Sequence, residues 1–200
     1  MTKPALDRKR QILTIATQLF SEGGFDKVTV GELAKACGIT EPAVYRHFKS
    51  KDAIYDAVLD SIAQRFDCTE LFDSLEGEQD VEVLLRRVAE HVISFFGANQ
   101  DIHRLLLYSV LSDHAKARQV FDITRGRYVH FLKLQFDRMF EAGRIIKKNN
   151  EITARCFVGM IFDCALGQTL WKKYADKRFP PEDVIANNIP IYAIGLKVKS

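Results

Sequence analysis

Residues 29–51 constrain the fold of this chain more than any other stretch, because they fit two short amphipathic helices joined by a glycine turn. Thr29, with Glu32 three residues later, matches a capping box and predicts a helix that begins near Val30. Gly38 stands where a left-handed residue must end that helix. The apolar residues between them recur at helical spacing, at Val30, Leu33, Ala34 and Cys37.

The second helix of this pair starts at Thr40, which can cap it, and runs through about Phe48. Pro42 lies in its first turn, where a missing N–H costs nothing. Ala34, Gly38 and Val44 stand at the three points where two steeply crossing helices leave least room. The combination predicts a helix-turn-helix, a fold that reads DNA.

The second helix carries its polar groups on the side opposite Val44 and Phe48, which face the core. A short helix of this kind can enter the major groove and meet base edges. Lys49, Ser50 and Lys51 then lead into a further helix whose N-terminal amides point outward, an arrangement suited to phosphate. The outward set is Glu41, Ala43, Tyr45, Arg46 and His47.

At these residues the chain resembles the TetR family of bacterial transcriptional repressors. The similarity runs from about Leu6 to Ile62 and includes the turns at 20–25 and 38–40 and the stretch 45–51. The resemblance implies a homodimer that binds a palindromic double-stranded DNA operator and is released by a small-molecule effector. It also implies phosphate contacts from Thr29, Thr40, Tyr45, His47 and Lys51, with Lys49 beside them, and base contacts from Glu41, Pro42, Ala43 and Arg46.

Two positions depart from the family pattern. Gly31 occupies a place where some members have a long basic side chain that reads a base. Glu41 would accept a hydrogen bond from cytosine rather than donate one to guanine. A second interpretation of Glu41 stays open, since an acid in a first helical turn also complements the helix dipole.

The rest of the chain predicts an all-α protein, with a helix-turn-helix domain at 1–52 followed by a larger helical domain for ligand binding and dimerisation at 53–200. A linking helix with a stripe from Ile54 to Phe66 continues to about residue 67. Residues 71–80 are expected to form a loop. Further helices are expected at 81–96, 102–111, 119–142, 152–174 and 184–198, separated by glycine, proline and polar segments.

The helix expected at 152–174 is apolar on two faces and must therefore be sandwiched. By resemblance, the last two helices of each subunit form a four-helix dimer interface. Pro190 is a departure that should kink or split the last helix. The candidate interface residues are Val158, Ile161, Phe162, Ala165, Ile185, Ile189, Tyr192 and Leu196.

Aromatic residues of the larger domain are candidates to line a pocket for a small, largely apolar ligand, although such stripes are more often solid core. Three interpretations of Asp163 stay open: it anchors a cationic ligand, pairs with a nearby arginine, or lies at a wet edge of the interface. The candidate pocket residues are Phe95, Phe96, His103, Tyr108, Phe121, Tyr128, Phe131, Phe157, Asp163 and Trp171.

Several classes are disfavoured by the sequence. It has no nucleophile or phosphate-cradling glycine motif of an enzyme, no metal-ligand spacing among its histidines, and no cofactor motif. The charged N-terminus and the lack of an apolar span predict a cytoplasmic protein with no membrane segment. The four cysteines favour buried free thiols over a redox switch. The remaining alternative is a DNA-binding regulator with a solid helical domain that responds to a protein partner.

Overall fold

The computed structural model describes residues 3–112, 114–171 and 180–198. Its regular elements in these residues are helices, apart from one isolated bridge between Ile145 and Lys197, so the predicted all-α class is confirmed. By their contacts, residues 1–65 and 101–121 form one compact unit, and residues 66–100 and 122–200 form a second. Among the described helices, none combines the length and the apolarity that crossing a membrane demands.

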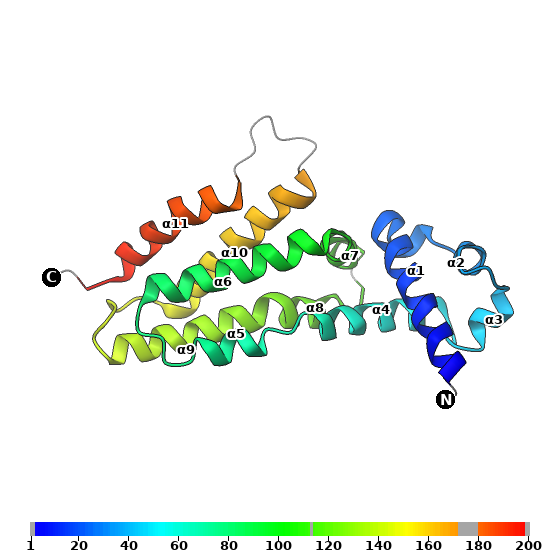
Figure 1. Ribbon diagram of the computed structural model, residues 1–200, viewed down its shortest axis with the longest axis horizontal. Coiled ribbons are helices and arrows are strands. Elements are labelled where there is room, and N and C mark those ends of the chain that lie inside the picture. Colours follow the sequence, from blue (N-terminus) through cyan, green and yellow to red (C-terminus); the bar gives the residue numbers. More distant parts are fainter. Residues whose placement is uncertain (1–2, 113, 172–179, 199–200) are drawn as a thin grey trace. The chain divides into compact units, whose positions relative to one another are not determined.

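The first unit contains α1 (Lys3–Lys27), α2 (Val30–Ala36), α3 (Glu41–Tyr45) and α4 (Lys51–Arg65), with α7 (Gln100–Leu111) and α8 (Ala117–Phe121) (Figure 1). The domain boundary expected near residue 52 is a different division from this grouping by contacts, in which α4 and the distant segment 101–121 belong with α1, α2 and α3. Contacts between segments so far apart in sequence leave no local pattern. The core is built from apolar side chains on α1, α2, α3 and α4, among them Ile12, Phe20, Leu33, Val44, Ile54, Val58 and Leu59.

Helix α1 is interrupted near its end by Gly24, whose φ of 75° no ordinary helical residue adopts. The ring of Tyr108 on α7 lies so close that a Cβ at position 24 would stand 3.1 Å from its Cδ1 atom. Gly24 is therefore required twice, for its backbone conformation and for the approach of an aromatic ring. The interruption turns the chain so that Phe25 packs on Tyr55 of α4, with ring centroids 5.0 Å apart.

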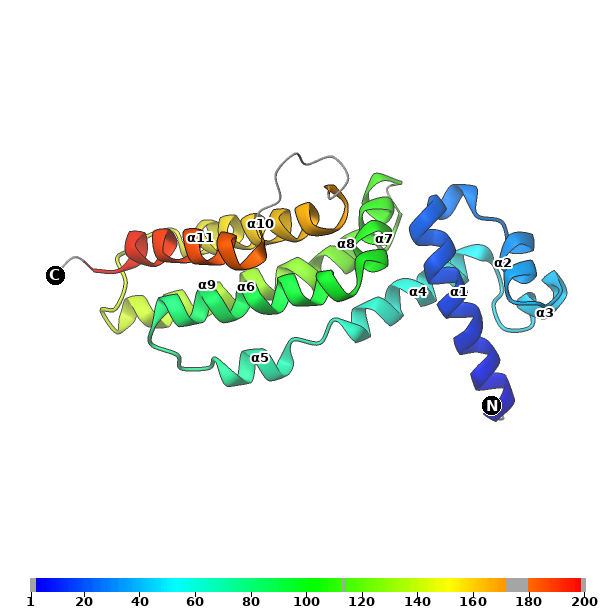
Figure 2. The ribbon, with the colours of Figure 1, turned by 45° about the horizontal axis from the view of Figure 1, so that its top comes forward.

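The second unit contains α5 (Thr69–Ser74), α6 (Val81–Ala98), a π-helix η1 (Asp122–Gly126), α9 (Arg127–Glu141), α10 (Asn150–Thr169) and α11 (Pro181–Leu196). Helix α10 packs against both α9 and α6, and α11 packs against α6 (Figure 2). Asp80 caps α6 by accepting a hydrogen bond from the Glu82 amide. The buried stripe of α6 recurs every three or four residues, at Val81, Leu84, Leu85, Val88, Ala89, Val92, Ile93 and Phe96. Each fully buried aliphatic side chain of this kind contributes about 1.5–3 kcal/mol.

Three predicted elements differ from the structure. Residues 69–74 form helix α5 rather than a loop, because Phe72 stacks on Phe131 with ring centroids 4.2 Å apart. The single helix expected at 119–142 is divided by η1 into α8 and α9. Helix α11 continues through Pro190 and is not split there. The predicted end of α10 at 172–174 lies outside the described residues.

The four cysteines are only partly buried. Cys37 and Cys68 are buried as expected, whereas Cys156 is exposed and Cys164 is half-buried, because both lie on the side of α10 that no described helix covers completely.

Candidate nucleic-acid interface

The predicted capping box of α2 is present and uses the polar groups of Thr29. The Thr29 hydroxyl accepts a hydrogen bond from the Glu32 amide at 3.1 Å and donates one to the Glu32 carboxylate at 2.9 Å. The Thr29 amide donates to the same carboxylate at 2.8 Å, which lowers the pKa of Glu32. Thr29 is exposed, but the hydroxyl donor that was expected to hold a phosphate is engaged in starting the helix.

The turn between α2 and α3 is a Schellman motif. Gly38 has a φ of 67°, and its amide donates to the Lys35 carbonyl at 3.1 Å. The Ile39 amide donates to the Ala34 carbonyl at 3.0 Å, so the last carbonyls of α2 are satisfied. A Cβ at Gly38 would meet nothing within 4 Å, and only the backbone conformation demands glycine there. The turn sets the direction in which α3 leaves α2.

Helix α3 presents its outer side to solvent, as the sequence predicts. Val44 is fully buried and Phe48 nearly so, and both hold α3 on the core. The helix ends at Tyr45, earlier than the predicted end near Phe48. The Thr40 side chain makes no capping hydrogen bond, which leaves its hydroxyl available to another partner. The predicted DNA contacts on α3 and its flanks are exposed at Thr40, Glu41, Pro42, Tyr45 and Arg46, and half-buried at Ala43 and His47.

At the start of α4, the two lysines differ in their surroundings. Lys49 is exposed, whereas the Lys51 ammonium donates to the carbonyls of Phe25 at 2.8 Å and Val28 at 3.1 Å. It also lies 4.2 Å from the centroid of the Phe25 ring. Lys51 therefore braces the chain between α1 and α2 with two of its three donors. No local sequence pattern predicts this internal role, because the acceptors are main-chain atoms more than twenty residues away.

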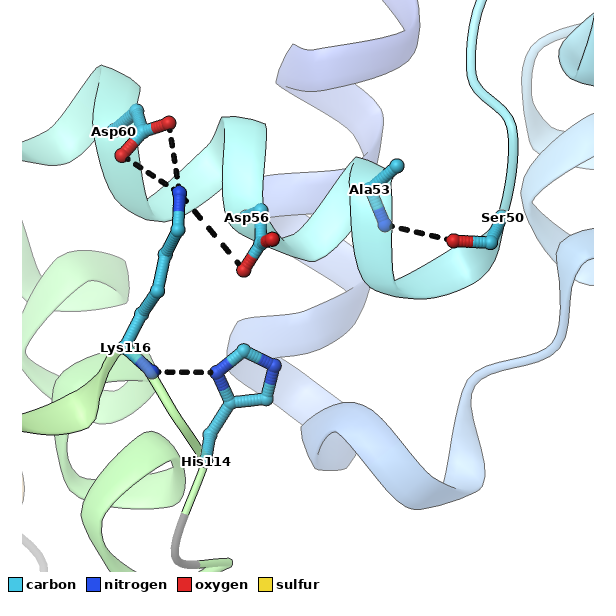
Figure 3. A network of polar contacts seen from close by, with 6 residues as sticks. All are labelled: Ser50, Ala53, Asp56, Asp60, His114 and Lys116. Atoms are coloured by element: carbon cyan, nitrogen blue, oxygen red, sulfur yellow. Dashed lines mark hydrogen bonds and ion pairs between the residues drawn. The ribbon is translucent and has the colours of Figure 1, made fainter.

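His114 and Lys116, between α7 and α8, contact α4 within the same unit (Figure 3). The Lys116 ammonium lies 2.9 and 3.0 Å from the two carboxylate oxygens of Asp60 and 3.9 Å from Asp56. The His114 ring packs 4.7 Å from the ring of Tyr55 and 5.5 Å from that of Phe25. We call His114 and Lys116, together with Tyr55, Asp56 and Asp60 of α4, the clasp. None of these residues was predicted to be functional.

Tyr55, at the centre of this aromatic group, is fully buried, and its hydroxyl has no hydrogen-bond partner among the residues that the structure describes. Burial, reinforced by the nearby Asp26 carboxylate, raises the pKa of Tyr55 to about 12. The hydroxyl is therefore neutral throughout the physiological range. An unsatisfied buried hydroxyl costs about 1–3 kcal/mol, so the burial of the Tyr55 hydroxyl lowers the free energy of unfolding.

The aromatic side chains of the second unit form a packed cluster rather than a row along one cavity. Phe66 contacts Phe95, Phe96 and Tyr128 with ring centroids 4.4–5.7 Å apart. His91 Nδ1 lies 2.6 Å from the Tyr128 hydroxyl. Burial lowers the pKa of His91 and raises that of Tyr128 well above its ordinary value, so both groups are neutral near pH 7.

The predicted pocket residues are scattered. Phe95, Phe96, Tyr128 and Phe131 belong to this cluster, whereas Phe157 packs 5.2 Å from Tyr192. His103, Tyr108 and Phe121 belong to the first unit, and Phe121, Asp163 and Trp171 are exposed. Because Asp163 is exposed, the burial cost that made it conspicuous does not arise within the chain. One open groove in this unit, of about 670 Å³, runs between α6 and the start of α11 and is lined by none of the ten candidates.

The structure assigns the predicted interface residues to the interior. Seven of them are buried against other helices of the same unit, and Tyr192 is half-buried. The sequence pattern identified two apolar faces on α10, and the face expected to meet the partner is buried within the chain itself. Both faces are apolar, so only packing distinguishes them. We call the exposed set on and beside α10 and α11 the outer face: Ile152, Cys156, Asp163, Trp171, Ile191, Ile194 and Val198.

Comparison with known proteins assigns residues 12–58 to a family described as "Bacterial regulatory proteins, tetR family". The nucleoid occlusion factor SlmA of Glaesserella parasuis is 25% identical over 171 residues, which cover 84% of this chain and 82% of that protein. Two solved structures share the fold. A TetR-family regulator from Mesorhizobium loti has a TM-score of 0.72 and 16% identity, and covers 99% of this chain and 100% of its own. AibR, in complex with isovaleryl coenzyme A and operator DNA, has a TM-score of 0.67 and 22% identity, and covers 92% of this chain and 97% of its own.

Proposed function

The chain belongs to the TetR family of bacterial DNA-binding transcriptional regulators through residues 12–58, and we propose that it is a repressor released from a palindromic operator by a small, largely apolar ligand. The observation that carries the DNA-binding part is the exposed face of α3 on a buried base. Val44 and Phe48 fix the helix to the core, while Glu41, Tyr45 and Arg46 stand free to meet a major groove.

The test of DNA binding is selection of binding sites from random duplexes with the full-length protein, followed by titration at several salt concentrations. We expect a palindromic site with half-sites about one helical turn apart, and an affinity that falls steeply with salt. Binding without any sequence preference would contradict the proposal. Tyr45→Ala should weaken binding to all sequences alike, since a phosphate contact carries no base information.

The proposed ligand site is the aromatic cluster of the second unit. Its rings are in contact, with centroids 4.2–5.7 Å apart, so a ligand that enters between them must displace them and would select a minor conformation of the free protein. The Arg125 side chain lies 4.5 Å from the Phe162 ring centroid, and burial together with nearby Arg155 lowers the pKa of Arg125. A ligand with an apolar body would suit the aromatic side chains of this site. AibR, whose structure contains isovaleryl coenzyme A, provides a precedent among proteins of this fold.

The release of the protein from DNA by a ligand has a strict thermodynamic test. If a compound found by thermal-shift screening is the effector, operator DNA must weaken its binding by the same factor by which the compound weakens DNA binding. Calorimetric titration with and without operator measures that factor. Equal affinities in the two experiments would identify the compound as a passenger.

The alternative is that the second unit has no small-molecule pocket and that the protein responds to binding of a protein partner. The similarity to SlmA, a nucleoid occlusion factor, and the solid packing of the aromatic cluster favour it. The two proposals make different demands on the cluster. A Phe96→Ala variant that still folds should alter the response to a small ligand but leave a surface-bound protein partner unaffected.

A further inference from the structure

We call residues 29–51 the reading head. Within it, Gly31 on α2 and Glu41 on α3 share one small space. A Cβ built on Gly31 would stand 2.7 Å from Oε1 of Glu41 and 3.6 Å from its Cδ atom. The carboxylate of Glu41 therefore occupies the volume that any other side chain at position 31 would take. The backbone φ of Gly31 is not positive, so the backbone conformation does not require glycine at this position.

The carboxylate in this space is not held there by an internal partner. Among the described residues, no hydrogen bond or ion pair is recorded for Glu41, and the side chain is exposed at the first turn of α3. Pro42 follows it and fixes the backbone φ at the start of that helix. A five-residue helix has only a small dipole, so its N-terminus alone gives little reason for the acid.

An acid at a DNA-facing position repels the phosphates of any sequence. It improves discrimination only where a base donates a hydrogen bond to it. In the major groove, cytosine offers the N4 amine, and a glutamate is suited to accept from it, whereas guanine and thymine present no donor. Adenine also offers an amine, at N6, but its N7 acceptor lies beside that amine and repels a carboxylate. The same carboxylate therefore favours one base and disfavours others.

We propose that Gly31 and Glu41 act as one specificity determinant, in which Gly31 leaves the space that lets the Glu41 carboxylate accept a hydrogen bond from the N4 amine of a cytosine in each half-site. The proposal rests on the DNA-binding function proposed above. Gly31 contributes through Glu41 and makes no base contact of its own, so its effect must vanish when the carboxylate is removed.

The test is base preference measured with the full-length protein on the selected operator and on duplexes changed at single positions. We expect cytosine at one position of each half-site, preferred about ten-fold over other bases. Glu41→Ala should abolish this preference and, by removing a repulsive charge, increase affinity for unrelated DNA. Gly31→Ala should displace the carboxylate and reduce the preference, while the melting temperature stays equal or rises, because alanine is the better helix former.

The double variant provides the decisive comparison. In the Glu41→Ala background, Gly31→Ala should change base preference no further, because no carboxylate remains to be displaced. Glu70→Gln, an exposed acid in the first turn of α5, controls for net charge, and Gly97→Ala in α6, where a Cβ meets nothing within 4 Å, controls for helix stability. Both controls should retain the wild-type preference.

The outcomes separate the two proposals. Wild-type protein that selects no site overturns both the DNA-binding function and the pairing. If wild-type protein selects an operator but Glu41→Ala keeps its base preference, the pairing is wrong and the function stands. The pairing is also wrong if Gly31→Ala changes base preference equally with and without Glu41.

Discussion

At the scale of single residues, the reading head contains lysines that look alike in sequence and differ in what they touch. Lys51 donates to two main-chain carbonyls, while Lys49 is exposed. We expect Lys51→Ala to lower the free energy of unfolding by about 1–2 kcal/mol, because two charge-assisted hydrogen bonds are lost. Lys49→Ala should leave stability unchanged and weaken binding to all DNA sequences. Denaturant unfolding and DNA titration of both variants measure these effects; equal loss of stability in the two would contradict the assignment.

His91 gives a residue-scale prediction on pH. Burial lowers its pKa in the folded protein below the value near 6.5 that it has when unfolded. At pH above about 6.5 both states hold it neutral, and its full contribution to stability is present. As pH falls below that value the unfolded chain binds a proton before the folded one, so stability is lost until the folded pKa is reached.

We therefore expect the free energy of unfolding to fall as the pH drops below about 6.5, and His91→Gln to reduce that dependence. The measurement is chemical unfolding at a series of pH values. His47→Gln, which changes a half-buried histidine next to α3, is the matched control. An unchanged pH profile in His91→Gln would show that other groups control acid stability.

At the scale of residues, the sequence predicted which side chains are exposed better than it predicted their hydrogen-bond partners. Periodicity assigned Val44 and Phe48 to the core and Glu41, Tyr45 and Arg46 to solvent, and all five are found so. It could not predict the internal bonds of Lys51, because the Phe25 and Val28 carbonyls are brought to it only by the fold.

At the scale of elements, the clasp joins the α7–α8 connection to α4. The connection lies in segment 101–121 of the first unit. The chain leaves the second unit at residue 100 and returns to it at residue 122, so this segment is joined to the second unit at both ends. An exposed ion pair contributes only about 0–1 kcal/mol to stability. We therefore expect the pairs of Lys116 with Asp60 and Asp56 to position the connection on α4 and to add little to the stability of the fold.

We expect Lys116→Ala to leave the melting temperature nearly unchanged and to reduce the factor by which an effector weakens operator binding. The measurement is the reciprocal titration of ligand and DNA. Lys133→Ala, which removes the exposed pair with Asp137 on α9 at 2.7 Å, is the matched control and should retain the coupling. A coupling factor that survives in Lys116→Ala would exclude the clasp from transmission.

Capping and turn chemistry explain why some elements were predictable. The Thr29 capping box and the Gly38 turn are local signals, and both appear in the structure where the sequence indicated. Helix α5 was missed because its stability comes from the stacking of Phe72 on a residue of α9. The π-helix between α8 and α9 carries no proline that would have marked it.

At the scale of the whole molecule, the outer face of α10 and α11 is the surface we expect to form a two-fold dimer. A palindromic site requires two reading heads, and an exposed apolar face on the last two helices is costly in water unless covered. Ile194 is 74% exposed on this face, whereas Ile189, five residues earlier on the same helix, is fully buried. The two positions therefore distinguish association from folding.

We expect Ile194→Glu to yield a folded monomer, because the charge stays in water in the free subunit but would be buried and unpaired in the dimer. Ile189→Glu should fail to fold, since the charge enters the interior of the unit itself. Leu134→Glu, at a 40% exposed position on α9 outside this face, should remain dimeric. Sedimentation at micromolar concentration with circular dichroism separates these outcomes, and operator binding should weaken with dimer loss. A dimer that persists in Ile194→Glu would mean that another surface joins the subunits.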